Sequence, residues 1–593
     1  MKRYSLLTME GMEKTKGLMD ACLGKGQADR AVTNGTVLNV YTGEWIRNQT
    51  ILIKGEWIVF VGSDPQEGIG PETTVIDAAG KPVIPGLIEG HTHLADCLYS
   101  PAEFLGFVMT GGTTTIITEC IEPFPIRGEN GIVDFLAAFR DQPIKIFATL
   151  PPMASTSRLS QGMPRETLRR LLARDDVLGL GESYWQAVLQ DPEAFLGNFE
   201  ETLLTGRKVE GHSAGAKGRA LSAYVASGVS SCHEPITAEE VLERLRLGLH
   251  VMVREGSIRA DLGAIIDLQD AGIDHRRIIL VTDGVRPLDL VERGYMEYVV
   301  QRAIDAGIHP VKAIQMATLN VADYFGLDGI IGGIAPGRQA DLLILPSETT
   351  LRPAIVISRG KVIAKDGKLL VPPRVHAFSP ETLRSVELPR AMTPQDFAIA
   401  VNSQAPQARV RVIHQVTDLV TRELIISLPV EGGKIRCDPD QDILKVAAVD
   451  RRFVPGKTFV GLVRGFGLKA GALAASSSWD TSDIIVVGAN ESDMADAVNR
   501  IHTLQGGVVL CAGGKVLAEI PLPIFGLMSD APLQDLAKSI EAMSSHAKAL
   551  GFSFADPHRT VIPLTGAAIP FIRISEQGLV DIKTGKTVPL IVE

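Results

Sequence analysis

The chain has 593 residues, of which 45% are hydrophobic and 22% charged, and its formal net charge is −10. This length exceeds one compact core, so we expect two or three domains. The acidic balance argues against a nucleic-acid partner, which would need a basic face. No apolar run reaches the roughly 18 residues of a membrane-spanning helix, so we expect no membrane association.

The cysteines and the N-terminal residues indicate the cellular compartment in which the protein works. Six cysteines are scattered along the chain without a CxxC pair: Cys22, Cys97, Cys120, Cys232, Cys437 and Cys511. Free thiols of this kind are typical of a reducing compartment and not of a disulfide-stapled protein. The first residues carry charged side chains but no apolar core of signal-peptide type. We therefore expect a cytoplasmic protein.

The N-terminal part predicts a helical arm over 1–27 and a small antiparallel sheet over 28–80. In the second segment, β-branched and polar residues alternate around Asn-Gly, Thr-Gly and Lys-Gly turns. A segment of the same texture returns at 335–371. Each piece is too small to bury a core alone, so we expect one β-sandwich built from both flanks. Two independent hairpins are the alternative.

Between these flanks, residues 81–334 contain eight short apolar runs separated by amphipathic stretches. Eight consecutive β-α units predict a (β/α)8 TIM-like barrel, whose active site lies at the carboxyl ends of its strands. Those ends carry four histidines and three carboxylates: His91, His93, Glu119, Glu182, His212, His233 and Asp283.

The last third of the chain predicts a separate domain. A proline-rich linker covers 372–389, and 390–593 mixes apolar runs such as DIIVVGA with helical patterns such as ESDMADAVNRIHTLQ. We expect a C-terminal α/β domain there. The fold class predicted for the whole chain is α/β, with a (β/α)8 barrel, a small β-sandwich from both flanks and this C-terminal domain.

The histidines at the strand ends indicate a metal site. His91 and His93 are separated by one residue, and residues i and i+2 of a strand face the same side, so both imidazoles can reach one ion. His212 and His233 end two later strands. Each histidine alone could be a hydrogen-bonded rim residue, but four at one rim favour metal binding.

Two carboxylates complete this set. Glu182 has two oxygens and can bridge two cations, and Asp283 can take a proton from an activated water and pass it to a leaving group. A divalent ion lowers the pKa of bound water from 15.7 towards roughly 7. Nitrogen and oxygen donors without cysteine fit Mn, Fe or Zn better than a structural zinc site.

Longer motifs show a family resemblance that covers nearly the whole chain. The stretches PGLIEGHTH, GLGES, VEGHSAGAKGRALSAYVASGVSSCHE, VREGS and MATLNVADYFGLDGIIGGIAPGRQADLLIL resemble the amidohydrolase superfamily, and within it the adenine deaminases. The stretches GFGLKAGALAASSS, DIIVVGANESDMADAVNRI and PLPIFGLMSDAP resemble the C-terminal domain of the adenine deaminases. Amidohydrolases in general do not carry that domain, so this match is specific.

The resemblance implies two divalent ions per chain, with Mn²⁺ expected first and Fe²⁺ or Zn²⁺ possible. His91, His93 and Asp283 would hold one ion, His212 and His233 the other, and Glu182 would bridge them. Many hydantoinase-like relatives use a carbamylated lysine as the bridge, so a glutamate there separates this chain from them.

Departures from the family pattern concentrate where family members would contact substrate. Adenine deaminases usually carry Asp-Pro-His-Glu where this chain has Glu-Cys-Ile-Glu at 119–122. They usually carry Thr-Asp-Asp where it has Thr-Asp-Gly at 282–284, and His-Asp-Ser-His-Asn where it has Trp-Asp-Thr-Ser-Asp at 479–483. We interpret the metal ligands as intact and the purine-contacting residues as changed.

The sequence therefore predicts a metal-dependent hydrolytic deaminase, and in the first place an adenine deaminase that converts adenine and water to hypoxanthine and ammonia. One alternative is an amidohydrolase that acts on a different cyclic amidine or amide with the same binuclear centre. A second alternative is an inactive binding or assembly homologue. We expect a homo-oligomer of two or more subunits.

Further residues are predicted to act on a small heterocyclic substrate. Asp283 would move the proton, and either Glu119 or Glu122 would protonate a ring nitrogen. Four other residues are expected to contact the substrate: Arg254, Ser257, Trp479 and Asp480.

Overall fold

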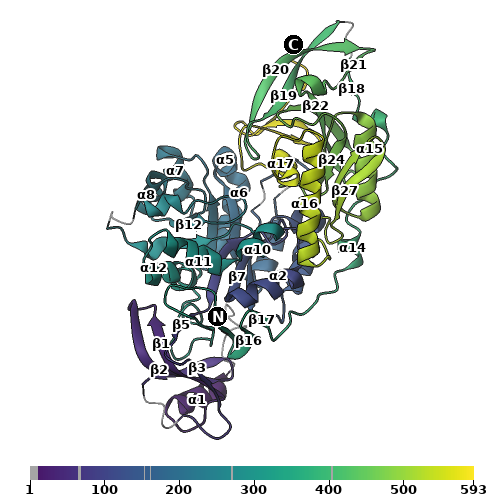
Figure 1. Cartoon of the computed structure of the whole chain (residues 1–593). Helices are drawn as coiled ribbons and strands as arrows, with labels where there is room; N and C mark the ends of the chain where they lie inside the picture. Colours follow the sequence, from purple (N-terminus) through teal and green to yellow (C-terminus); the bar gives the residue numbers. More distant parts are fainter. Residues whose placement is uncertain are drawn as a thin grey trace.

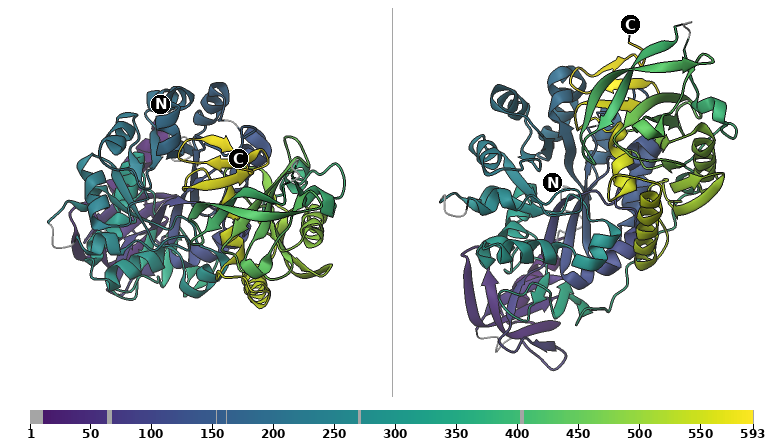
Figure 2. Two further views of the ribbon diagram at one scale, coloured as in Figure 1. Left: turned by 90° about the horizontal axis from the view of Figure 1, so that it is seen from above. Right: turned by 45° about the horizontal axis from the view of Figure 1, so that its top comes forward.

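The computed structural model describes residues 11–63, 68–152, 154–160, 162–268, 272–401 and 405–592. Three regions follow one another in space: an N-terminal sheet, a central region of strands and helices, and a C-terminal region (Figure 1). The polypeptide enters and leaves the central region through the N-terminal sheet, and the C-terminal region packs against the opposite end (Figure 2).

The central region contains the eight predicted strands. Five form one parallel sheet, a half-barrel: β6 (Leu87–Thr92), β7 (Thr113–Glu119), β8 (Lys145–Leu150), β9 (Val177–Tyr184) and β10 (Lys208–His212). Three form a second parallel sheet: β11 (Ser231–Cys232), β12 (His250–Arg254) and β13 (Ile278–Val281). The two sheets contact each other between β10 and β11 and again between β13 and β6.

Helices connect these strands and cover their outer faces. They are α2 (Pro101–Val108), α3 (Pro123–Ala138), α4 (Arg165–Leu172), α5 (Trp185–Gln190), α6 (Pro192–Leu204), α7 (Gly218–Ala226), α8 (Ala238–Arg246), α9 (Gly263–Ile266), α10 (Pro287–Arg293), α11 (Met296–Asp305), α12 (Pro310–Met316) and α13 (Leu319–Phe325). In α8, the Thr237 side chain caps the N-terminus by accepting from the Glu240 amide, and Val241 faces the core. Every residue of β7 is buried, as expected for a strand covered on both faces.

The two flanks of the central region join in one sheet. Its nine strands are β1 (Arg30–Asn39), β2 (Glu44–Lys54), β3 (Trp57–Gly62), β4 (Thr74–Asp77), β5 (Pro82–Pro85), β14 (Leu342–Ile344), β15 (Ile355–Ser358), β16 (Lys361–Lys365) and β17 (Lys368–Leu369). The junction is the antiparallel pair β5–β14, where Ile84 lies opposite Leu343. One sheet thus carries both flanks, and it bends back so that the Ile58 amide donates to the Arg338 carbonyl, just before β14.

The described part of the N-terminal arm is α1 (Gly11–Cys22), which packs on β3 of this sheet. Ala21 shares a hydrophobic cluster with Leu52 and Val59. The first ten residues of the predicted arm lie outside the described residues.

The C-terminal region is mostly sheet, which corrects the expectation of an α/β domain. A ten-stranded sheet contains β18 (Ile399–Ala400), β19 (Gln407–Gln415), β20 (Thr421–Glu431), β21 (Lys434–Ile435), β22 (Leu444–Asp450), β23 (Thr458–Arg464), β24 (Ala472–Ala475), β25 (Asp483–Gly488), β26 (Gly507–Ala512) and β27 (Lys515–Pro521). A three-stranded sheet contains β28 (Ile572–Ser575), β29 (Gly578–Asp581) and β30 (Lys586–Val588). Its main helices are α15 (Glu491–Leu504), α16 (Leu533–Ala549) and α17 (Pro557–Val561), and the first two match the predicted helical patterns.

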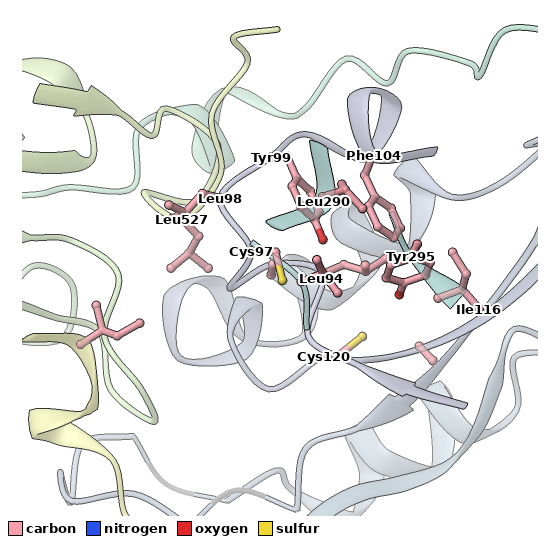
Figure 3. Close-up of a cluster of buried hydrophobic side chains, with 14 of the residues drawn as sticks. Leu94, Cys97, Leu98, Tyr99, Phe104, Ile116, Cys120, Leu290, Tyr295 and Leu527 are labelled. Carbon is pink, nitrogen blue, oxygen red and sulfur yellow. The ribbon is translucent and has the colours of Figure 1, made fainter. Parts of the chain in front are cut away.

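Apolar packing joins the C-terminal region to the loop that follows β6. Leu94, Leu98 and Tyr99 are buried there, and Leu527 of the C-terminal region lies beside Leu98 (Figure 3). The Ser529 amide donates to the Leu98 carbonyl at 2.6 Å. This loop is therefore fixed from both sides. Within the described part of the chain, we find no helix with the length and apolar character needed to span a bilayer.

A buried histidine joins the two regions by hydrogen bonds. Arg286, which follows β13, donates to His558 Nδ1 at 2.7 Å, and His558 Nε2 lies 2.5 Å from Ser477 Oγ. Because Arg286 can only donate, Nδ1 must be the acceptor and Nε2 carries the proton. Burial, and then the charge of Arg286, lower the pKa of His558 to about 3.

This histidine should make the fold acid-sensitive. The folded pKa of about 3 lies below the unfolded value of about 6.5, so below pH 6.5 only the unfolded state gains the proton. As pH falls from 6.5 towards 3, protonation of His558 in the unfolded state therefore lowers the free energy of unfolding by up to about 1.4 kcal/mol per pH unit. We expect His558→Gln to flatten this part of the pH profile of unfolding free energy, measured by denaturant titration. His546→Gln on the exposed face of α16 is the control, and equal slopes for both variants would contradict the assignment.

Candidate metal centre and substrate cavity

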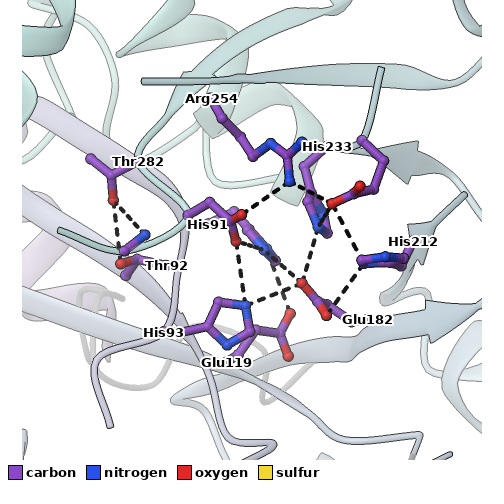
Figure 4. A network of polar contacts seen from close by, with 12 residues as sticks. His91, Thr92, His93, Glu119, Glu182, His212, His233, Arg254 and Thr282 are labelled. Atoms are coloured by element: carbon purple, nitrogen blue, oxygen red, sulfur yellow. Dashed lines mark hydrogen bonds and ion pairs between the residues drawn. The ribbon is translucent and has the colours of Figure 1, made fainter. Parts of the chain in front are cut away.

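The predicted metal ligands meet at the carboxyl ends of the parallel strands (Figure 4). His91 lies within β6 and His93 directly after it, Glu182 lies in β9, and His212 ends β10. His233 and Asp283 follow β11 and β13. Five of these six residues are less than 9% exposed, and His93 is only slightly more open. The strand-end positions in the sequence thus converge on one buried point.

Glu182 lies at the middle of this cluster. Its Oε1 is 3.3 Å from His91 Nε2, 3.1 Å from His93 Nε2 and 3.0 Å from His233 Nε2. Its Oε2 is 3.5 Å from His212 Nδ1. Burial would raise the pKa of Glu182, but the surrounding histidines outweigh it and lower that pKa well below its ordinary value. One carboxylate therefore contacts all four imidazoles, three of them through Oε1 and one through Oε2.

The donor atoms fit a divalent cation. Nε2 of His91 and both ring nitrogens of His212 are buried without a hydrogen-bond partner. Donor atoms of His91, Glu182, His233 and Asp283 all lie within 4.8 Å of one another, and so do those of a second group formed by His212, His233 and Glu234. Buried imidazole nitrogens without partners are costly, and a cation would satisfy them.

Asp283 is held in a fixed orientation. Its Oδ1 is 3.4 Å from His91 Nε2 and 3.5 Å from His93 Nε2, while its Oδ2 accepts from Arg254 at 3.2 Å. Its φ of 57° lies in the left-handed region, which aspartate tolerates better than most residues. Arg254 also bonds to Glu234 at 2.5 Å and to Asp261 at 2.9 Å, so it is fully engaged by carboxylates.

The two glutamates predicted as ring acids lie at different depths. Glu122 lines the cavity above the centre, and its Oε1 is 2.6 Å from His93 Nδ1. Glu119 is buried beneath the centre, 3.6 Å from His91 Nδ1, and is not among the residues that line the cavity. Burial raises the pKa of Glu119 to about 8. Of these two, only Glu122 is placed to reach a substrate.

The cavity has a volume of about 360 Å³ and lies between the central region and the C-terminal region. This size is within the range of small-molecule sites. Its wall includes metal-centre residues together with Trp479, Asp480, Leu419 and Ile569 from the C-terminal region. Arg573 is fully buried and fixes the two C-terminal segments of this wall. Its guanidinium donates to the Leu419 carbonyl at 2.7 Å and to the Ile569 carbonyl at 3.0 Å.

The predicted substrate contacts divide into two groups. Arg254, Trp479 and Asp480 line the cavity, but Ser257 does not. The Ser257 hydroxyl instead donates to Asp289 and accepts from the Arg286 amide.

The Asp480 carboxylate lines the cavity but is already hydrogen-bonded to other protein groups. Its carboxylate accepts from Tyr184 Oη at 2.9 Å and from the Ala567 amide at 2.7 Å. Burial raises the pKa of Asp480 to about 7.

Sequence reasoning missed several residues that line the cavity, among them Asp96, Tyr184 and Glu234. Glu234 directly follows His233 and Tyr184 comes two residues after Glu182, so their closeness to predicted ligands was the available indication. Asp96 lies three residues beyond His93 in a loop, where no periodicity shows which way a side chain faces.

Known proteins match the chain from end to end. The Amidohydrolase family matches residues 83–365, and the Adenine deaminase C-terminal domain matches residues 418–586. The adenine deaminase of Moorella thermoacetica is 36% identical over 587 residues, which cover 98% of each chain. That of Cenarchaeum symbiosum is 34% identical over 581 residues, with 97% of this chain and 94% of that one covered. The chain therefore belongs to the adenine deaminase family of metal-dependent amidohydrolases.

Proposed function

We propose that this protein is an adenine deaminase, which hydrolyses the exocyclic C–N bond of adenine and releases hypoxanthine and ammonia. The observation that carries the proposal is the position of Glu182, whose carboxylate lies within 3.5 Å of all four histidines at the floor of a cavity of about 360 Å³. The full-length similarity to proteins named adenine deaminase supports the choice of substrate.

The same proposal includes the architecture of the site. We propose that the five-stranded and three-stranded parallel sheets are the two arcs of one (β/α)8 barrel over 81–334, supported by the contacts that join their edges. The small sheet would form a second unit over 28–80 and 335–371. The C-terminal unit would cover 390–593 and contribute the cap of the cavity.

We propose that the centre holds two divalent ions, with Mn²⁺ first. His91, His93 and Asp283 would bind one ion, His212 and His233 the other, and Glu182 both. When bound, such ions make water a nucleophile at neutral pH and polarise the carbon that is attacked.

The protein's own groups would move the protons. Asp283 would accept a proton from the attacking water and deliver it to the departing ammonia. Arg254 holds Asp283 Oδ2, which leaves Oδ1 facing His91 and His93. Glu122 would donate to a ring nitrogen next to the reacting carbon, because it lines the cavity and is anchored by His93.

Adenine turnover should be measurable but poor. Ile121, which stands where relatives usually carry histidine, is buried against Tyr184 and Ala568 and lines the cavity. A polar group of the substrate left unpaired there costs about 1–3 kcal/mol, or roughly ten- to a hundredfold in rate. We expect Ile121→His to raise kcat/KM for adenine, measured by ammonia release from the Mn-loaded enzyme. The matched control is Ile121→Leu, which should not raise it.

A wild-type kcat/KM for adenine of about 10⁶ M⁻¹s⁻¹ would contradict the expectation that adenine is a poor substrate.

The second departure from the family pattern, glycine in place of aspartate at position 284, cannot be reversed as simply. Gly284 has φ 106°, and a Cβ there would lie 3.2 Å from Cys97 Sγ, so Gly284→Asp would strain the backbone. This glycine is built into the loop that carries Asp283.

The apolar wall at Ile121 favours a second candidate substrate. This would be a related heterocycle that has the same amidine group but fewer polar ring atoms than adenine. An ammonia-release screen of purines, pterins and cyclic amides would rank the two. Ammonia from no heterocycle, with the metal bound, would contradict a deaminase of either kind.

We further propose that the protein works in a reducing compartment such as the cytoplasm, because all six cysteines are unpaired.

A further inference from the structure

Asp96 is the polar residue of an apolar loop at the rim of the cavity. Leu94, Ala95, Cys97 and Leu98 around it are at most 3% exposed and belong to one hydrophobic cluster, and Figure 3 shows Leu94, Cys97 and Leu98 in it. The Asp96 side chain instead lines the cavity, although the residue is only 7% exposed. Because the loop is packed on both sides, the direction of this carboxylate is fixed before any ligand binds.

The partners of Asp96 do not account for its charge. Among the described residues, no basic side chain lies within 4.0 Å of its carboxylate. Arg286, whose charge lowers the pKa of Asp96, instead bonds to His558 at 2.7 Å and pairs with Asp556 at 3.6 Å. The indole of Trp479 lies beside Asp96, and burial outweighs the charges of Arg286 and His93 and raises the pKa of Asp96 to about 6.

A buried carboxylate without an ion pair costs folding free energy, and such groups in clefts are candidates for ligand-binding or catalytic residues. Two oxygens accept about four hydrogen bonds, so the indole leaves most of the acceptor capacity unused. The unused capacity faces the cavity, and a ligand with an N–H group would satisfy it.

We propose that Asp96 is a specificity-determining residue that accepts a hydrogen bond from the imidazole-ring N–H of the purine. This inference rests on the proposed function, which places the exocyclic amino group of adenine at the metal centre. The imidazole ring then holds the remaining N–H donor of adenine, at N7 or N9. A carboxylate without its proton can only accept, so it selects for that N–H and against purines in which both positions lack hydrogen.

The test is a binding experiment that needs no turnover. Hypoxanthine has the imidazole N–H, whereas 7-methylhypoxanthine and 9-methylhypoxanthine lack it. Their affinities for the Mn-loaded full-length enzyme are measured by calorimetry. Asp96→Ala should weaken hypoxanthine binding roughly ten- to a hundredfold and leave the methylated ligands within about twofold or bind them better. Asp96→Asn, which keeps one acceptor oxygen, should lose less.

Asp556→Asn is the matched control, because Asp556 is near Arg286 but does not line the cavity. It should bind hypoxanthine within about twofold of wild type. Equal losses for hypoxanthine and both methylated ligands in Asp96→Ala would mark Asp96 as a packing residue and overturn the inference. So would unchanged hypoxanthine binding, or a wild-type enzyme that binds no ligand of the three. A wild type that binds hypoxanthine through Asp96 yet releases no ammonia from adenine would refute the proposed reaction, while the contact of Asp96 with the purine N–H would still be supported.

Discussion

Replacing His91 and His93 together by alanine should remove about one of two bound divalent ions and nearly all deaminase activity. Both imidazoles present Nε2 to Glu182 and Asp283, within 3.1–3.5 Å. Without them, this group of ligands keeps only Asp283 and Glu182, which is fewer than the three protein ligands of a typical catalytic metal site. Metal content per chain is measured by elemental analysis after dialysis, and activity by ammonia release.

The control for this experiment is a double variant outside the site, His275→Ala with His546→Ala. It removes two imidazoles and should keep both ions and full activity. Circular dichroism shows whether the site variant is folded, so that lost metal is not confused with lost structure. If purified and metal-supplemented wild type holds no ion, or if the site variant keeps as many ions as wild type, the assignment of this centre is wrong.

The clustering of the four histidines with Glu182 and Asp283 could be predicted because parallel strands tie sequence to place. A residue at the end of a parallel strand must lie at the carboxyl rim, so His91, Glu182 and His212 were found from apolar runs alone. The nine-stranded sheet was predicted only in part. Alternation shows that a segment is a strand, but β5 pairs not only with β1 but also with β14, more than 250 residues later, and no local pattern encodes that second pairing.

The rest of the site depended on contacts between distant segments. Glu119 and Glu122 are three residues apart and looked equivalent as acids, yet one lies beneath the centre and the other lines the cavity. Ser257 was expected in the cavity, but its hydroxyl is used by Asp289. Such differences follow from side-chain direction in loops, where neither the helical nor the strand period applies.

The fold class of the C-terminal region was also predicted only in part. Its two long helices were recognised from apolar spacing, and their strength suggested an α/β domain. The sheet dominates because ten strands, several of them only two to four residues long, join one ladder. Strands that short carry too few residues for alternation to be detected.

Replacing Asp283 by asparagine should lower kcat by roughly 10²–10⁴-fold, the usual worth of a positioned acid–base group. Asparagine has the same size and also tolerates the left-handed backbone at φ 57°, so the variant should fold with the loop intact. It loses the base while four histidines and Glu182 remain, so metal content should fall less than in the histidine variant. Asp261→Asn is the matched control: it frees the far side of Arg254 without touching the base, and its kcat should drop far less. Near wild-type turnover of Asp283→Asn would mean that another group moves the proton, and an equal loss in both variants would mean that Asp283 matters mainly through the position of Arg254.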